Sequence, residues 1–188
     1  MIAPKRMLTV ALAAVLLAAA WGVVALTPSE DVAQAPFATA ATIGEEAVAR
    51  NLAVTVTDVR ASAEVSDAAG WSATGTWLVV DLEAASREDQ EHALLDIAQL
   101  VIGDRTFSAT DRGTTFARHR LVTGVPREGS LAFELPDDAL TGTATLRLGL
   151  STGAPGETPL DDVITLSIDL DALTPTGSTT LLENGWAR

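Results

Sequence analysis

The sequence has no cysteine, no tyrosine and few other aromatic residues. Among 188 residues there are 0 Cys, 4 Trp and 4 Phe. A chain without cysteine forms no disulfide, carries no thiolate nucleophile or cysteine-based zinc site, and offers no lipobox cysteine for a lipid anchor. Because aromatics are scarce, Ala, Val, Leu and Thr must fill most of the interior. Together with 14 Gly and 8 Pro, this composition favours β structure joined by turns.

Lysine is almost absent too. The single lysine, Lys5, and Arg6 come before a long uncharged segment. Without these two, 10 basic residues stand against 25 acidic ones, so the remainder carries a formal charge of −15. Such a domain repels phosphate backbones, and no nucleic-acid binding is expected. The lack of any later lysine also excludes a phosphate-binding loop and a Ser–Lys catalytic dyad.

Catalytic and metal-binding motifs are lacking as well. His92, in a charged stretch typical of an exposed loop, and His119 are the only histidines, and they lack the spacing of zinc ligands. No G-x-S-x-G or H-E-x-x-H sequence occurs. The sequence therefore predicts a protein that is not an enzyme, with no catalytic, cofactor-binding or metal-binding residues and no cofactor.

Three acidic pairs are suitable oxygen donors for calcium. They follow a proline or lie near strand ends, where aspartate is common in turns, and no EF-hand loop is present. We interpret them as turn residues and keep calcium as the alternative. The pairs are Asp137 with Asp138, Asp161 with Asp162, and Asp169 with Asp171.

One long apolar run lies near the N-terminus. Met7 to Leu26 contains twenty residues without a charge, and a helix of that length spans about 30 Å, the thickness of a bilayer's hydrocarbon core. Basic residues precede the run and acidic ones follow it, so the positive-inside rule places residues 1–6 in the cytoplasm. We expect an uncleaved, single-pass signal anchor over residues 7–26 in the cell membrane, with the C-terminal domain outside. A cleaved signal peptide, with Ala33-Gln34-Ala35 as the peptidase site, is the alternative.

Three segments follow this anchor. Residues 27–49 are rich in Pro, Ala, Thr and acidic residues without a sustained period, which is typical of a flexible stalk. At the end of this segment, Gly44 to Arg50 is compatible with a short helical turn. Residues 50–171 form the folded domain. Residues 172–188 form a polar tail, whose Trp186 either docks on the domain or serves as an adhesive motif.

Residues 50–171 alternate apolar and polar side chains in short runs, which predicts about seven strands. A shift of phase predicts a bulge near Asp58, and Gly103-Asp104 predicts a hairpin turn. Asp81 and Glu83 are expected on a solvent-facing side, and one helical stretch is expected over Arg87 to Leu95. The strands are expected over residues 52–59, 77–84, 97–102, 105–108, 131–135, 143–150 and 164–170.

Strands with one dry face must stack in two sheets to bury those faces. The pattern therefore predicts an all-β, antiparallel β-sandwich. A closed barrel, which has the same local signature, is the structural alternative.

Several motifs resemble those of a known family. They are the run Gly75 to Leu82 (GTWLVVDL), Gly103-Asp104 before Phe107, Gly124, and the run Gly129 to Pro136 (GSLAFELP). They resemble the uncharacterised immunoglobulin-like ectodomains of Gram-positive, mostly actinobacterial, membrane proteins and lipoproteins, which are similar in fold to the secreted mycobacterial immunoprotective antigen. The resemblance covers about residues 50–171. It implies an immunoglobulin-like sandwich at the cell surface with a binding role, and it carries over no catalytic residues. The chain departs from the pattern at Glu83-Ala84-Ala85, where many relatives have an asparagine turn.

Basic residues cluster at one place in the acidic domain. This cluster, which we call the arginine group, predicts a patch that recognises a carboxylate or a partner protein. Cross-strand pairing with Glu128, Glu134 or Asp111 is the plainer interpretation. The arginine group consists of Arg112, Arg118, His119, Arg120 and Arg127.

Together these features favour a membrane-anchored extracytoplasmic binding or interaction module without catalytic activity. Its partner is expected to be an envelope protein or a cell-wall polymer. Two alternatives stay open: a purely structural spacer in the envelope, and a hydrolase that uses two carboxylates about 5–10 Å apart in a cleft.

Overall fold

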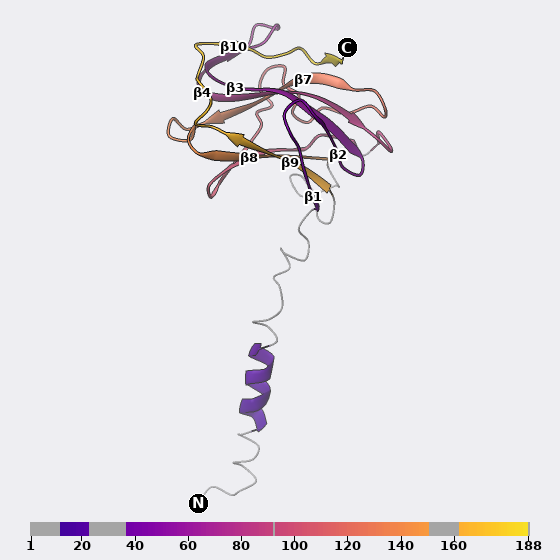
Figure 1. Cartoon of the computed structure of the whole chain (residues 1–188), viewed down its shortest axis with the longest axis vertical. Coiled ribbons are helices and arrows are strands. Elements are labelled where there is room, and N and C mark those ends of the chain that lie inside the picture. The colour runs from indigo at the N-terminus through magenta and orange to yellow at the C-terminus, as the bar shows by residue number, and fades with distance from the viewer. Residues whose placement is uncertain (1–11, 23–36, 92, 151–161, 188) are drawn as a thin grey trace, which may run out of the picture. The chain divides into compact units, whose positions relative to one another are not determined.

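A computed structural model of the chain describes residues 12–22, 37–91, 93–150 and 162–187. The chain divides into two compact units, Met1–Ala35 and Pro36–Arg188. In the first unit, residues 12–22 form a helix (Figure 1). Among the described residues, no helix is both long and apolar enough to cross a membrane. Residues 7–11 and 23–26 of the expected anchor lie outside the described residues, and the anchor stays a prediction.

The second unit is built from two β-sheets, which Figure 1 shows as two layers with β3, β4 and β7 in one and β8 and β9 in the other. Sheet I contains, in spatial order, β1 (Phe37–Ala40), β9 (Asp162–Asp169), β8 (Thr143–Gly149), β5 (Ile97–Ile102) and β6 (Arg105–Ser108). Sheet II contains β10 (Thr179–Thr180), β3 (Leu52–Ser66), β4 (Ser72–Ser86), β7 (Arg127–Leu135) and β11 (Gly185–Trp186), with β2 (Glu46–Val48) also beside β3.

The main core lies between the sheets and follows from the alternation of the strands. In β4, Leu78, Val80 and Leu82 are fully buried on the side that faces sheet I, and Leu146 and Leu148 of β8 meet them from the other side. Burial of each such side chain stabilises the fold by about 1.5–3 kcal/mol. The two sheets are separate and each has its own edge strands, so the fold is an all-β sandwich and the barrel alternative is wrong.

All seven predicted strands are present, as β3 to β9. β3 is bulged between Val56 and Asp58, as predicted. Gly103, at a φ of 60°, turns the hairpin between β5 and β6. The pairs between these seven strands are antiparallel. Two short strands depart from the antiparallel prediction, because β1 lies parallel to β9 and β10 lies parallel to β3.

The predicted stalk over residues 27–49 is too long at its C-terminal end. Residues 37–40 form β1 and residues 46–48 form β2, and Ala47 and Ala49 are buried in the main core. Strands of three or four residues contain too few positions to show a period, so the sequence pattern missed them. Residues 27–36 lie outside the described residues.

The helical stretch expected over Arg87 to Leu95 is wrong for the residues that are described. The side-chain oxygen of Asn51 accepts hydrogen bonds from the backbone N–H groups of residues 87, 88 and 89, at 3.1, 2.7 and 3.2 Å. The guanidinium of Arg120 donates to the carbonyls of Gln90 and Glu91 at 3.2 and 2.7 Å. These tertiary bonds hold the segment in bends and a turn. The helical turn expected over Gly44 to Arg50 is wrong as well, because β2 lies there.

Candidate binding surfaces

The outer face of sheet II carries a second, smaller apolar cluster. It contains Trp77 and Val79 of β4, Val65 of β3 and Ala132 of β7, all fully buried although they point away from the main core. Leu181, 3% exposed, completes the cluster from outside the sheet. The sheet is therefore dry on both faces at this point. This corrects the expectation of one wet face per sheet.

A segment of the C-terminal tail contributes to this burial through Leu181, and Trp71 packs edge-on against Trp77 with 6.1 Å between the ring centroids. Residues 176–187, which we call the strap, begin beside β3, where β10 pairs with Val65 and Ser66, and end beside β7, where β11 pairs with Glu128 and Arg127. Figure 1 shows the strap along the outer side of the layer that contains β3, β4 and β7. The predicted polar tail is thus part of the domain.

A buried polar network fixes the strap to the sheet. Asp81, 6% exposed, forms an ion pair with Arg60 across neighbouring strands. Ser130 Oγ donates to Asp81 Oδ1 at 2.5 Å and accepts from the backbone N–H of Leu182 at 2.8 Å. The expectation that Asp81 faces solvent is therefore wrong. A charged residue in the apolar run of β4 was the one signal of this network in the sequence.

Beyond the strap, three glutamates and a threonine form one row across the outer face of sheet II. Glu46 is opposite Thr55, Thr55 is opposite Glu83, and Glu83 is opposite Glu128, on the neighbouring strands β2, β3, β4 and β7. Residues directly opposite each other point to the same face, and like charges in that position destabilise a sheet. Among the described residues, none forms an ion pair with these three glutamates.

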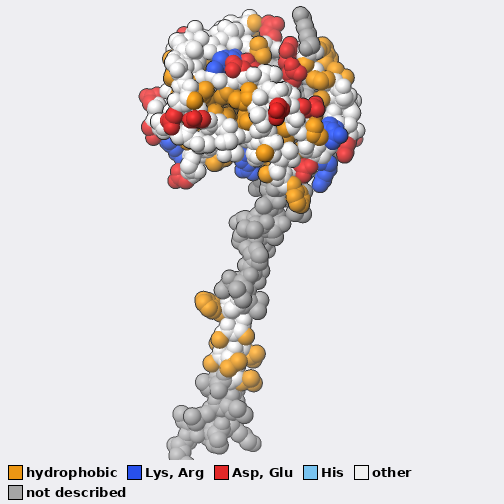
Figure 2. Space-filling view, viewed as in Figure 1, with side chains coloured by type: hydrophobic (Ala, Val, Ile, Leu, Met, Phe, Trp, Pro, Cys, Tyr) orange, Lys and Arg blue, Asp and Glu red, His pale blue; other side chains and the backbone are white. Residues whose placement is uncertain are grey.

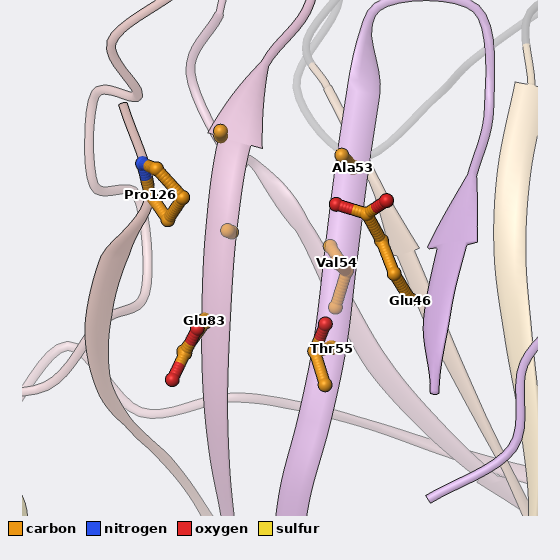
Figure 3. A pocket seen from close by; sticks show the side chains of 8 residues that line it. Glu46, Ala53, Val54, Thr55, Glu83 and Pro126 are labelled. Atoms are coloured by element: carbon orange, nitrogen blue, oxygen red, sulfur yellow. The ribbon is translucent and has the colours of Figure 1, made fainter. Parts of the chain in front are cut away.

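A small open hollow lies between two of these glutamates. Its floor is formed by small side chains of β3 and β4, among them Ala53 and Ala85, and Pro126 forms one wall (Figure 3). In Figure 3 the carboxylate of Glu46 lies over β3 near Ala53, whereas that of Glu83 points away from it. A second open hollow shares part of this lining, including Glu46 and Pro126, and continues past Val48, which is 40% exposed.

The arginine group is divided among separate contacts. Arg112 pairs with Glu134, one of the predicted partners, and lies over the ring of Trp77 at 5.5 Å. Arg118, at a φ of 57°, places its Nε 3.4 Å from Asp96 Oδ1. Arg120 holds the carbonyls of Gln90 and Glu91. Each of these three side chains thus has its own contact within the domain.

His119 and Arg127 are the members of the arginine group that the structure brings together. His119 stacks on Phe116 with 4.9 Å between ring centroids, and burial, together with the nearby charge of Arg127, lowers the pKa of His119. Arg127 lies 5.0 Å from the centroid of the Trp186 ring in the strap. Trp186 is still 56% exposed, so it docks on the domain and also offers apolar surface. The role of the arginine group in ligand binding stays a prediction.

The acidic pairs considered for calcium take part in turn contacts. Asp137 accepts a hydrogen bond from Thr76 Oγ1 at 2.7 Å and Asp138 pairs with Arg105. Asp171 accepts from the backbone of Gly142 at 3.0 Å, and Asp162 from that of Arg50 at 2.7 Å. Within the described ranges, no three His, Cys, Asp or Glu residues come together as a metal site. Asp161 and His92 lie outside those ranges.

The outer face of sheet I differs from that of sheet II in its chemistry. Eight of its outward positions on β5, β6, β8 and β9 form two rows across the strands, and they carry hydroxyl and amide groups, the side chain of Val101 and a single guanidinium, that of Arg147. One row contains Thr106, Val101, Thr145 and Ser167, and the other contains Ser108, Gln99, Arg147 and Thr165. All eight side chains are half-buried or exposed. At one end of this face, the outward side chains of Ile97 and Val163 are apolar and buried.

Acidic and apolar side chains share the domain surface shown in Figure 2. Comparisons of the chain with protein families, with curated proteins and with solved structures find no match.

Proposed function

We propose that the chain is a membrane-anchored, extracytoplasmic interaction module with an immunoglobulin-like fold and no catalytic activity, and that its partner is an envelope protein that presents cationic groups. The observation that carries this proposal is the row of Glu46, Glu83 and Glu128 beside the hollow of Figure 3. The row costs the free domain stability, since like charges stand opposite each other. A cationic partner converts this repulsion into attraction.

The order of the strands supports an immunoglobulin-like fold. Variable-type immunoglobulin domains place strands A, B and E in one sheet and G, F, C and C′ in the other. Sheet II contains β3-β4-β7 and sheet I contains β9-β8-β5-β6, which are the same orders when the seven strands are lettered A, B, C, C′, E, F and G along the chain.

Binding fits the hollow better than carboxylate catalysis does. A glycosidase needs its two carboxyl groups on either side of one scissile bond. Glu46 and Glu83 stand two strands apart on an open surface, and their carboxylates point apart in Figure 3. An open floor of small side chains instead leaves room for a side chain of a partner.

The uncharged run from Met7 to Leu26 supports the membrane anchor. Residues 12–22 within it are helical, and a helix over all twenty residues would match the bilayer core of about 30 Å. The test is to treat intact cells that express the full chain, tagged at its C-terminus, with protease. We expect loss of the tag in intact cells and retention of the chain in washed membranes. Protection of the tag until lysis would contradict the proposed placement.

The partner is tested by crosslinking intact cells and purifying the full chain with its adducts. Glu83→Lys places a cation in the glutamate row, and we expect it to reduce the adducts about tenfold. Asp104→Lys makes the same change of charge in the exposed turn of the β5–β6 hairpin and serves as the matched control. Equal adducts from the two variants would contradict a binding role for the glutamate row.

A further inference from the structure

The outer face of sheet I is nearly neutral in a domain that is strongly acidic. Its outward positions include one cation, Arg147 on β8, and one anion, Asp169 on β9. The other outward positions between them are Thr, Ser, Gln and Val. Depletion of charged residues is the compositional mark of the centre of a protein interface. Two acidic domains can approach each other through this face without bringing carboxylates together.

Arg147 and Asp169 lie at equal distances along the strands on the two sides of Thr145. Along β8, Arg147 lies two residues to one side of Thr145, and Thr143 lies two residues to the other side. Thr143 is the register partner of Asp169. Consider a twofold axis that lies between the two faces, parallel to the sheets and perpendicular to β8 at Thr145. This axis places Arg147 of each copy over the Thr143–Asp169 pair of the other. Neighbouring strands are only about 4.8 Å apart, so the long arginine side chain reaches this pair.

The uncharged groups of the face also fit a copy of themselves. Hydroxyl and amide groups both donate and accept hydrogen bonds, so a surface of Thr, Ser and Gln can pair with an identical surface. Carboxylates only accept and guanidinium groups only donate, so the glutamate row of sheet II cannot pair with itself. In a twofold interface the same patch serves both partners, which requires this kind of self-complementarity.

Arg147 is the charged group most available to such a contact. It is half-buried in the middle of the face, and none of the described residues forms an ion pair with it. Partly buried arginines are frequent anchors of protein interfaces. A second copy would supply the missing carboxylate from Asp169.

We infer that two copies of this chain associate through the outer faces of sheet I, about a twofold axis at Thr145, with Arg147 of each copy paired with Asp169 of the other. A face of a few short strands is small for a permanent dimer in dilute solution, because stable interfaces bury about 1,200–2,000 Å² in total. Confinement of both copies to one membrane raises their effective concentration. In this respect the inference depends on the membrane anchor of the proposed function. The dimer leaves the glutamate row of sheet II free for another partner.

The absence of cysteine makes this dimer directly testable. Thr145→Cys in the full chain is the only thiol, and a disulfide forms between copies when their Cα atoms lie within about 7 Å. Thr55→Cys is the matched control, because it is also a half-buried strand threonine but lies on the outer face of sheet II. After mild oxidation of membranes from expressing cells, we expect at least about tenfold more disulfide dimer from Thr145→Cys than from Thr55→Cys.

The ion pair is tested by reversing its charges in the Thr145→Cys background. Arg147→Asp places two anions opposite each other and is expected to reduce the disulfide dimer about tenfold. Adding Asp169→Arg restores the pair with its signs exchanged and should restore the dimer. Circular dichroism of each variant checks that the sandwich is intact. Equal crosslinking of the two cysteine variants, adducts only with other proteins, or no rescue by the double exchange would overturn the inference.

Failure of the anchor is distinguishable from failure of the dimer. If the protease test contradicts the membrane placement, the disulfide dimer can still be measured with the purified full chain at high concentration. A dimer there with Thr145→Cys alone supports the interface without the anchor. Membrane-bound chains that do not crosslink through Thr145→Cys leave the anchor intact and remove the interface.

Discussion

Sheet I and sheet II each turn every second side chain away from the main core, and their two outer faces differ in what they carry and in what covers them. On sheet II, Trp77, Val79 and Asp81 are buried under the strap and the side chain of Trp71, and the uncovered part carries the glutamate row. On sheet I, the outward positions around Thr145 are neutral and half-buried or exposed. The same period of two therefore produces an acidic face that the strap covers in part and a nearly neutral face that is accessible around Thr145.

This difference shows that the average charge of the domain is a poor guide to its surfaces. The formal charge of −15 after Arg6 suggests repulsion of any acidic neighbour. The register of the strands concentrates carboxylates on sheet II and leaves sheet I nearly neutral. Surface chemistry thus depends on which strands are neighbours, and neighbours are set by the topology.

The largest loss of stability is expected from removal of the polar network under the strap. Asp81→Ala leaves the partly buried guanidinium of Arg60 without its main partner and Ser130 without its acceptor. Breaking a buried ion pair on one side is strongly destabilising, so we expect the free energy of unfolding to fall by about 3 kcal/mol. Urea unfolding of the domain measures it.

Asp138→Ala is the matched control for this prediction. It removes the exposed ion pair with Arg105, whose side chains are 74% and 41% exposed, and should cost no more than about 0.5 kcal/mol. Equal losses of stability in the two variants would show that the network under the strap is no stronger than a surface pair.

The next largest loss of stability is expected when the apolar contact between the strap and the sheet is removed. Leu181→Ala opens a cavity in the cluster around Trp77 and Val79, and we expect a loss of about 2–3 kcal/mol in urea unfolding. Its neighbour Leu182 is 40% exposed, and Leu182→Ala keeps the backbone N–H that binds Ser130, so its effect should stay within about 0.5 kcal/mol. A strap that contributes nothing to stability would make both substitutions equally mild.

The strands of the two sheets could be predicted from the sequence, whereas the strap could not. Alternation revealed the seven strands β3 to β9, since each contains enough apolar positions to show its period. The strap strands β10 and β11 have two residues each, and nothing local indicates that Leu181 joins the apolar cluster of Trp77. The expected helix over Arg87 to Leu95 failed for a similar reason. Its backbone is bound by Asn51 and Arg120, which are distant in sequence.

The candidate surfaces were less predictable than the fold. The arginine group is close in sequence, but its members reach separate partners, because Arg118 and Arg120 point to Asp96 and to the carbonyl of Glu91. The glutamate row was missed because its members come from three strands and are 37 or more residues apart. A surface that is assembled by register leaves no local motif. Only a correct pairing of the strands reveals it.

A smaller change in stability tests whether the carboxylates of the glutamate row repel each other in the folded domain. Glu83→Gln removes one of the two like charges that stand opposite each other, and it should stabilise the free domain by about 0.2–0.5 kcal/mol at low salt. The gain should shrink as salt rises, because exposed charges are screened. Glu134→Gln, which weakens the pair with Arg112, should give no gain. Urea unfolding at two salt concentrations measures both variants, and a loss of stability in Glu83→Gln would show that the row is not repulsive.

The smallest change in stability depends on pH and comes from His119, which lies near Arg127. Burial, with the charge of Arg127, lowers the pKa of His119 below its ordinary value of 6.5 in the folded domain, whereas the unfolded chain keeps the ordinary value. As the pH falls through 6.5, the unfolded chain takes up this proton before the folded one does. The contribution of His119 to stability is therefore complete above pH 6.5 and declines below it.

His119→Phe isolates this titration, because a phenyl ring keeps the stack on Phe116 and carries no proton. We expect the difference in unfolding free energy between the natural chain and the variant to be constant above pH 7. Below pH 6.5 the natural chain should lose stability relative to the variant, and both proteins share every other titrating group. A difference that stays constant down to pH 5 would mean that His119 titrates alike in the folded and unfolded chains.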